Sequence, residues 1–376
     1  MKIGFDARPI NLYNGTGIGT YTENVLKHML NIDNENSYCL YWCGENYSRF
    51  AKSNCEISIT CRKHKSFYEN VYFPNSVHNK NIDVFHISQN GIGLSKNIEC
   101  KKIITVHDLI PYVMPETVGR GYLNKFLKNM PYLIPLADGI ITVSEYSKKD
   151  ILRFFPIDEN KIFVTPLAAN KKYKPMDKEK CAYMLKKHYD IDKPFILYIG
   201  GFSSRKNVKS LITAFSNVFN KLDKEYQLVI VGATKDKANS LLNISNNLNI
   251  KSNIIFTGFV CEDYLPILYN ACDLFVYPSL YEGFGLPPLE AMSCGACVMA
   301  SNLTSIPEVV GDGGILIDPY NIKDMEYNLE KILNQCNLQE SLKRKALSRA
   351  NLFSWENTAK KTLDVYKQVL YSDFCS

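Results

Sequence analysis

The sequence predicts an α/β protein of two domains, each built on a parallel sheet with helices on both faces. Its 376 residues exceed one typical core and suit two domains of similar size. Short apolar runs alternate with helical segments, an order that produces parallel sheets. The alternation restarts at residue 195, after the polar tract 170–175. We therefore expect one domain over residues 1–170 and a second over 171–354.

In the first domain, apolar runs predict strands at residues 3–5, 37–42, 56–60, 84–86, 102–106, 139–143 and 162–169. The glycine-rich segment 15–19 opens a helix that continues to residue 30, and Ser144 is a candidate N-cap for another helix. Parallel strands deliver functional side chains at their carboxyl ends, and His107 follows the 102–106 strand. Asp108 either orients His107 through a hydrogen bond or caps the next segment.

In the second domain, the same pattern predicts strands at residues 195–199, 227–232, 254–260, 274–276 and 297–301. Helices are expected at residues 208–219, 265–271, 287–295, 322–333, 338–351 and 355–370, with a turn-rich segment at 306–314. Arg205 and Lys206 lie next to the start of the 208–219 helix. Two cations there oppose the helix dipole, so they either bind an anion such as a diphosphate or are a solvated pair.

The central stretch of the second domain runs from Tyr277 to Met292 and carries two acidic residues, Glu282 and Glu290. Gly283 and Gly285 allow the loop to turn, and two prolines suit the first turn of the following helix. A helix N-terminus favours a phosphate. We expect Glu282 in the loop and Glu290 in the first helical turn, with both carboxylates facing the same opening of the ligand site. Carboxylates there can accept hydrogen bonds from sugar hydroxyls. Alternatively, both glutamates are ordinary loop and helix-dipole residues.

The segment Glu282-Gly-Phe-Gly-Leu-Pro-Pro-Leu-Glu290, preceded by Tyr-Pro-Ser at residues 277–279, resembles the E-x7-E signature of retaining, nucleotide-sugar-dependent glycosyltransferases of family 4. The resemblance implies the GT-B fold, in which two Rossmann-like domains face each other across a cleft. The first domain would lie on the acceptor side, and the second would bind the nucleotide sugar. The last helix, about 355–376, would pack back on the first domain.

The resemblance also assigns residues. It implies a catalytic set of His107, Glu282, Arg205 and Lys206, and donor-binding residues Gly17, Gly19, Arg205, Lys206, Val260, Glu282, Gly283, Phe284, Gly285, Leu286 and Glu290. Arg205 and Lys206 would hold the diphosphate, Glu282 the sugar hydroxyls and Glu290 the ribose. We expect the reaction to need neither metal nor cofactor, because these cations can neutralise the leaving group.

The segments 5–8 and 16–21 most resemble bacterial polysaccharide mannosyltransferases, which favours GDP-mannose over a UDP-sugar. The expected acceptor is a glycan or a lipid-linked glycan in cell-surface polysaccharide synthesis. The family's usual Asn-Gly pair before the linker is Ala168-Ala169 here, so no backbone contact is carried over. A catalytically silent sugar-nucleotide or glycan-binding subunit of the same fold is the alternative, which donor hydrolysis without acceptor would distinguish.

Other functional classes fit the sequence less well. A dinucleotide-binding fingerprint needs a later third glycine than Gly19 and an acidic residue where Cys39 stands. Asp190 and Asp192 have metal-site spacing but lie in a polar turn, and we interpret the Cys294 and Cys297 pair as structural thiols. The net charge of +6 is spread over both halves, so no nucleic-acid partner is expected.

The expected location is the cytoplasm, because the chain opens with a strand instead of a signal peptide and has no apolar run of roughly 18 residues. The segment 120–135 mixes aromatic and basic residues. It either lies on an anionic membrane surface or forms a core helix with a solvated basic side. We favour the core helix, because prolines shorten any continuous face.

Overall fold

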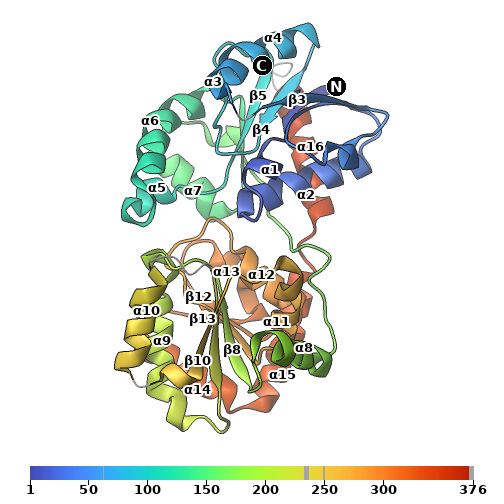
Figure 1. Ribbon diagram of the computed structural model, residues 1–376. Coiled ribbons are helices and arrows are strands. Elements are labelled where there is room, and N and C mark those ends of the chain that lie inside the picture. The colour runs from blue at the N-terminus through green and yellow to red at the C-terminus, as the bar shows by residue number, and fades with distance from the viewer. Residues whose placement is uncertain (62, 233–236, 249, 372–376) are drawn as a thin grey trace. The chain divides into compact units, whose positions relative to one another are not determined.

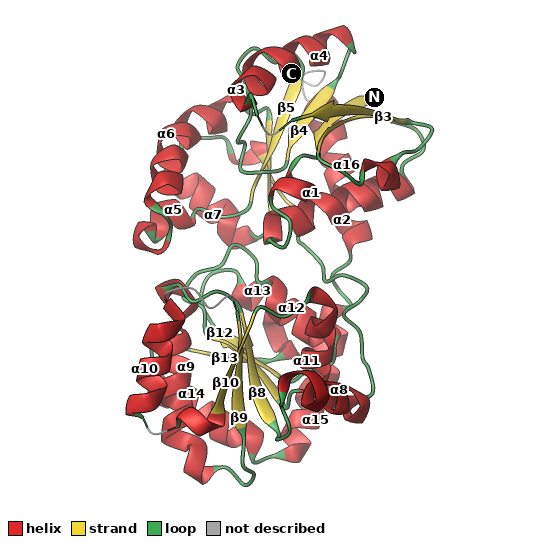
Figure 2. Ribbon diagram, in the orientation of Figure 1, coloured by secondary structure: helices red, strands yellow, loops and turns green. Residues whose placement is uncertain are grey.

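The computed structural model describes residues 1–61, 63–232, 237–248 and 250–371, and the chain divides into two compact units (Figure 1). Unit 1 comprises Met1–Leu167 and Ser354–Ser376, and unit 2 comprises Ala168–Phe353. Each unit contains one parallel sheet with helices packed around it (Figure 2). The predicted fold class is therefore confirmed.

The sheet of unit 1 has the strand order β3-β2-β1-β4-β5-β6-β7. Its strands are β1 Lys2–Asp6, β2 Ser37–Cys43, β3 Cys55–Thr60, β4 Val84–Ile87, β5 Lys101–Val106, β6 Gly139–Thr142 and β7 Ile162–Val164. Its helices are α1 Pro9–Leu12, α2 Gly17–Ile32, α3 Lys65–Phe67, α4 Phe73–Asn79, α5 Ile110–Val113, α6 Arg120–Leu136, α7 Glu145–Phe154 and α16 Trp355–Tyr371. A π-helical turn, Tyr68–Tyr72, joins α3 to α4.

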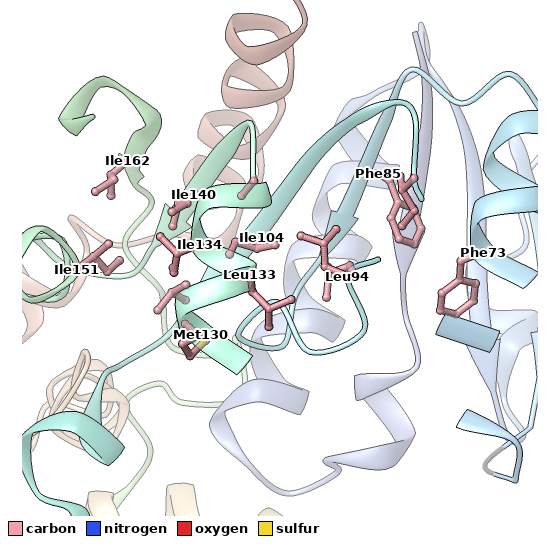
Figure 3. Packing of buried hydrophobic residues seen from close by; sticks show 14 of the residues in the cluster. Phe73, Phe85, Leu94, Ile104, Met130, Leu133, Ile134, Ile140, Ile151 and Ile162 are labelled. Carbon is pink, nitrogen blue, oxygen red and sulfur yellow. The ribbon is translucent and has the colours of Figure 1, made fainter. Parts of the chain in front are cut away.

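The core of unit 1 forms because the strands carry apolar residues on both faces, as buried parallel strands do. Ile104 and Ile140 from neighbouring strands meet Ile134 and Leu133 of α6, and Phe85 of β4 packs toward Phe73 (Figure 3). On α16, Tyr366 places its hydroxyl 2.6 Å from Nδ1 of the buried His86. These contacts hold the last helix on the unit 1 sheet.

The sheet of unit 2 has the order β10-β9-β8-β11-β12-β13. Its strands are β8 Phe195–Ile199, β9 Gln227–Val231, β10 Ile254–Gly258, β11 Leu274–Tyr277, β12 Val298–Ser301 and β13 Ile315–Ile317. Its helices are α8 Lys178–Tyr189, α9 Val208–Val218, α10 Lys237–Asn247, α11 Leu265–Ala271, α12 Leu286–Ser293, α13 Ile306–Val310, α14 Ile322–Leu333 and α15 Cys336–Ala350.

The division between the units follows the hydrogen bonds of the connecting segment. The carbonyl of Pro166 accepts a hydrogen bond of 2.6 Å from Thr358 of α16, within unit 1. Beyond it, the carbonyl of Lys174 and the amide of Met176 bond to Asn270 of unit 2. The sequence analysis placed the boundary a few residues later, after residue 170. Composition reveals the polar tract that follows, whereas the hydrogen bonds that assign each residue to a unit can be seen only in the structure.

Several elements differ from the predicted ones. The strand expected at residues 162–169 ends at Val164, and the turn-rich segment 306–314 contains α13. The sequence analysis did not predict α1, α3, α4, α5, α8, α10 or β13. In α8 the buried side chains are Cys181 and Leu185, so the apolar signal in that helix is weak.

Helix α6 continues through Pro131 and Pro135, so neither proline ends the helix. Its buried face, which includes Phe126 and Met130, packs into the core of unit 1, as the core-helix interpretation requires. Tyr132 is 71% exposed. Within the described ranges, no helix is long and apolar enough to cross a membrane.

Candidate functional site

The predicted basic pair and Glu282 meet at the carboxyl ends of β8 and β11, which are neighbours in the sheet of unit 2. The chain leaves β8 toward β9 on one side and continues from β11 toward β12 on the other. The connections therefore diverge between these strands, a position where open parallel sheets bind ligands. The turn Ser204–Lys206 follows β8, and the loop with Glu282 follows β11.

The carboxylate of Glu282 is the centre of this cluster. Its Oε1 lies 2.6 Å from Nζ of Lys206 and 2.8 Å from Nη1 of Arg205. The same oxygen accepts hydrogen bonds from the hydroxyls of Tyr277, at 3.0 Å, and Ser279. Glu282 is 9% exposed, so two cations and two hydroxyls surround a nearly buried anion.

The protonation state of Glu282 follows from these contacts. Burial alone would raise its pKa, but Lys206 and Arg205 outweigh burial and hold the pKa below its ordinary value. The carboxylate is therefore ionised at neutral pH. Opposite charges this close are each other's counterions, so an incoming anion must compete with Glu282 for the two cations.

The loop that carries Glu282 is fixed by the segment after β12. The amide of Glu282 donates to Oγ1 of Thr304 at 3.1 Å. The hydroxyl of Ser305 donates to the carbonyls of Glu282 and Phe284, at 2.9 and 2.8 Å. Sequence reasoning assigned no role to Thr304, Ser305, Tyr277 or Ser279, although Tyr277 and Ser279 belong to the quoted motif.

Gly285 and Leu286 form the start of α12. Gly285 is the N-cap residue with φ of +116°, in the region that favours glycine, and Leu286 is the first helical residue. Glu290 therefore lies beyond the first turn, and its predicted place within that turn was wrong. The error arose because Leu286, and not the prolines, begins the helix.

Glu290 has a polar environment of its own. The hydroxyl of Tyr269 donates to its Oε2 at 3.1 Å, and the ring of Tyr173 packs edge-on against Tyr269. Burial raises the pKa of Glu290 to about 7, since the hydrogen bonds from Tyr269 and Tyr173 only partly offset desolvation. The two glutamates thus have different partners and opposite pKa shifts, and they do not form one pair of neighbouring carboxylates.

Three other predicted donor-binding residues lie in loops of unit 2. Gly283 and Phe284 follow Glu282, but the side chain of Phe284 is buried against Phe353, so any contact that it makes with a donor uses its backbone. Val260 is buried just after β10. The preceding Gly258 has φ of +72°, and Phe259 between them is 82% exposed.

His107 lies in unit 1 after β5, as predicted, and its ring is largely buried. Nε2 donates to the carbonyl of Ser88 at 2.8 Å, and the ring packs edge-on against Tyr21. Burial lowers the pKa of His107 to about 4, so the ring is neutral at pH 7. Asp108 accepts a 3.1 Å hydrogen bond from the amide of Ile110, at the start of α5, a bond of the kind that the capping alternative expects.

The glycine loop of unit 1 caps α2. Thr16 is the N-cap and accepts a 3.4 Å hydrogen bond from the amide of Gly19. A Cβ on Gly19 would lie 2.3 Å from the carbonyl oxygen of Tyr13, so packing within the loop explains this glycine. A Cβ on Gly17 would meet nothing within 4 Å. Of the two, only Gly17 leaves open space beside the helix start.

The residues considered for other chemistry have structural places. Asp190 is the left-handed residue that ends α8. Cys294 and Cys297 are buried free thiols, and burial raises the pKa of Cys297 to about 12. Among the residues that the structure describes, no three His, Cys, Asp or Glu side chains gather as a metal-binding group.

Two family models match this sequence. "Glycosyl transferases group 1" matches residues 185–349, and "Glycosyltransferase Family 4" matches residues 17–171. The chain is 34% identical over 267 residues to O-antigen chain mannosyltransferase B of Escherichia coli, an alignment that covers 71% of this chain and 70% of that protein. It is 33% identical over 280 residues to the serotype-specific mannosyltransferase WbdA of Escherichia coli, covering 73% of this chain and about a third (34%) of WbdA.

Solved structures resemble the whole chain. Sucrose-phosphate synthase from Thermosynechococcus elongatus matches with a TM-score of 0.77 at 18% identity, over 99% of this chain and 100% of that one. Anabaena Alr3699/HepE, solved in complex with UDP and glucose, matches with a TM-score of 0.75 at 16% identity, over 98% and 100%. At these identities the likeness establishes the shared two-domain fold.

Proposed function

The chain belongs to the group 1 glycosyltransferases with the GT-B fold, as its sequence predicted, and from this premise we propose that it transfers mannose from GDP-mannose to a glycan or lipid-linked acceptor. The product would be a cell-surface polysaccharide. The observation that carries the proposal is the cluster of Arg205, Lys206 and Glu282 at the ligand-binding edge of unit 2. The names of the aligned relatives, which are O-antigen mannosyltransferases, support the choice of sugar and product.

In the proposed reaction, the diphosphate draws Arg205 and Lys206 away from Glu282. As the bond between the sugar and the diphosphate breaks, negative charge grows on the leaving group, and the two cations stabilise it most in the transition state. Arg205 suits paired phosphate oxygens because its guanidinium is planar, whereas Lys206 acts as a point charge. The protein supplies this charge itself, so we propose that no divalent metal or other cofactor is needed.

We also propose that the reaction retains the anomeric configuration without a covalent enzyme intermediate. Glu282 is a poor candidate for a nucleophile, because its Oε1 also accepts hydrogen bonds from the hydroxyls of Tyr277 and Ser279, which the diphosphate does not draw away. Its proposed role is to accept hydrogen bonds from sugar hydroxyls. The acceptor's proton then passes to an oxygen of the departing phosphate on the same face.

The other donor contacts in unit 2 are assigned by place. Glu290 would bind the ribose, and ionisation of its carboxylate would accompany that contact. The backbone of Gly283, Phe284, Gly285 and Leu286, at the start of α12, would meet the phosphates, and Val260 would lie under the base. The roles of His107, Gly17 and Gly19 toward the donor stay predictions from the family resemblance.

A peripheral contact with an anionic membrane at the cytoplasmic face is a further part of the proposal. Helix α6 would make it, since Arg120, Lys125 and Lys128 accompany the exposed Tyr122 and Tyr132. Vesicle flotation with and without anionic lipid would test this contact.

The deciding experiment is a thermal-shift panel of GDP, UDP and ADP sugars, followed by donor hydrolysis without acceptor. We expect GDP-mannose to give the largest shift and to be hydrolysed slowly. A larger shift with a UDP-sugar would favour the UDP-sugar-dependent alternative. Binding with no hydrolysis and no transfer would favour a silent binding subunit.

A further inference from the structure

The turn between β12 and α13 contains a backbone conformation that its residue type disfavours. Thr304 has φ of +57°, in the left-handed region. Among the residues that the structure describes, the other non-glycine residues with positive φ are asparagines, an aspartate and a histidine, which tolerate this region better than most. A β-branched residue such as threonine is an outlier there. Such strain persists where the surrounding structure imposes it, and it gathers at functional sites.

The side chain of this strained residue holds the loop that carries Glu282. Oγ1 of Thr304 accepts a 3.1 Å hydrogen bond from the amide of Glu282. The adjacent Ser305 is buried and donates to the carbonyls of Glu282 and Phe284. Ser305 occupies the N-cap position of α13 but makes no side-chain cap hydrogen bond, although a serine there normally stabilises its own helix. Two neighbouring residues thus give up local stability, and together they bind both backbone polar groups of Glu282.

The turn that contains Thr304 is itself anchored to the sheet of unit 2. The amide of Asn302 donates to the carbonyl of Ile317 in β13 at 2.8 Å. The turn also touches the far end of the Glu282 loop, because a Cβ on Gly285 would lie only 2.7 Å from Cδ1 of Ile306. The turn can therefore act as a fixed support for the loop.

Glu282 is held by contacts of two kinds. Its carboxylate pairs with Arg205 and Lys206, and in the proposed reaction the diphosphate draws these cations away. The hydrogen bonds from its backbone to Thr304 and Ser305 involve no charged side chain, so a phosphate does not compete for them. These backbone bonds therefore keep the residue in place at the stage when its cations are engaged by the donor.

We propose that Thr304 is a positioning residue for sugar transfer, whose hydroxyl fixes the amide of Glu282 and thereby directs the Glu282 carboxylate toward the donor sugar. The strained backbone of Thr304 is what brings the hydroxyl to that amide. The inference rests on the proposed function, because it concerns Glu282 with the sugar bound. Loss of the hydroxyl should slow the reaction of the sugar, since small misplacements lower rates strongly. It should spare nucleotide binding, because the phosphates contact Arg205 and Lys206.

The test compares two variants of Thr304. Thr304→Gly removes the hydroxyl, and glycine adopts positive φ without strain, so the variant should fold. Its kcat for hydrolysis of GDP-mannose should fall roughly ten- to a hundred-fold, while its affinity for GDP in calorimetry stays at the parental value. Thr304→Ser keeps the hydroxyl and should restore most of the parental kcat. Thr213→Ala is the control, because the hydroxyl of Thr213 bonds within α9, to the carbonyl of Lys209 at 3.0 Å. Parental kcat in Thr304→Gly, or equal losses in Thr304→Gly and Thr304→Ser, would overturn the positioning role.

A second measurement needs no sugar and separates this inference from the proposed function. Hydrogen exchange in peptides that contain residues 280–286 should be roughly tenfold faster in Thr304→Gly than in the parent, because the amide of Glu282 loses its acceptor. Exchange in Thr304→Ser should stay close to that of the parent. Equal exchange in the parent and Thr304→Gly would show that Thr304 does not place Glu282. If exchange depends on Thr304 but the parent neither hydrolyses GDP-mannose nor transfers from it, the placement of Glu282 stands and the proposed reaction fails.

Discussion

Replacing Glu282 by glutamine should strengthen nucleotide binding while it weakens sugar transfer. In the ligand-free protein, Glu282 competes with a diphosphate for Arg205 and Lys206, at 2.8 and 2.6 Å. Glutamine keeps the shape of the side chain but removes the competing charge. The nucleotide then no longer has to break two charge-assisted hydrogen bonds.

The magnitude follows from those contacts. A hydrogen bond to a charged group contributes about 1.5–3 kcal/mol. In the parent protein, the bonds from Arg205 and Lys206 to the phosphates recover much of the free energy that is lost when these cations leave Glu282. A net gain of about 1–2 kcal/mol is expected, or roughly five- to thirty-fold tighter GDP binding. The variant without ligand should be less stable by about 2–4 kcal/mol, because two mostly buried cations lose their counterion.

Calorimetry with GDP measures the affinity, and thermal unfolding with and without GDP measures the stability. Transfer should fall at least tenfold, because the hydroxyl contacts of Glu282 strengthen as the sugar approaches its transition state. Glu340→Gln is the control, since Glu340 pairs with Lys343 at 2.7 Å on the surface of the same unit. A tenfold loss of GDP affinity in Glu282→Gln, with Glu340→Gln unchanged, would refute the competition between Glu282 and the phosphates.

Four further predictions concern unit 2 and the proposed reaction. Arg205→Ala should lower kcat/KM by an amount equivalent to about 2–4 kcal/mol, measured by steady-state transfer, and parental activity would contradict its role at the phosphates. Transfer should persist in EDTA; complete loss that manganese restores would bring Asp190 and Asp192 back into consideration. Glu290→Gln should weaken both GDP and GDP-mannose by about 1–3 kcal/mol in calorimetry, and equal affinities would exclude the ribose contact. Folding raises the pKa of Glu290 from 4.5 to about 7, so the contribution of this residue to stability is complete below pH 4.5. That contribution falls by on the order of 2–3 kcal/mol as pH rises to 7. Denaturant unfolding should show this decline in the parent protein and not in Glu290→Gln.

The positions of most strands along the chain and the starts of the functional loops could be predicted, because they depend on local patterns. Apolar runs such as 195–199 and 274–276 mark strands that are buried on both faces, and glycine and proline mark where those strands stop. Helix α8 was missed although Asp177 caps it by accepting a 2.8 Å hydrogen bond from the amide of Lys180. That N-cap residue was the signal in the sequence that could have revealed the helix. The many polar side chains of α8 obscured its hydrophobic periodicity.

The contacts of the site residues could not be predicted, because they depend on elements far apart in the sequence. The sequence places Lys206 and Glu282 each at a ligand-binding edge, but their direct pairing requires β8 to lie beside β11. The opposite pKa shifts of Glu282 and Glu290 have the same origin. Cations from another loop surround Glu282, whereas tyrosines surround Glu290.

The charges of the unit 2 cluster argue for an anionic ligand. Arg205 and Lys206 face one carboxylate, Glu282, so the cluster carries an excess positive charge that a diphosphate can use. An uncharged sugar alone would leave that excess charge unmatched. In the proposed reaction, the departing diphosphate would match it increasingly as negative charge grows on the leaving group, so the cluster would stabilise the transition state more than the bound donor.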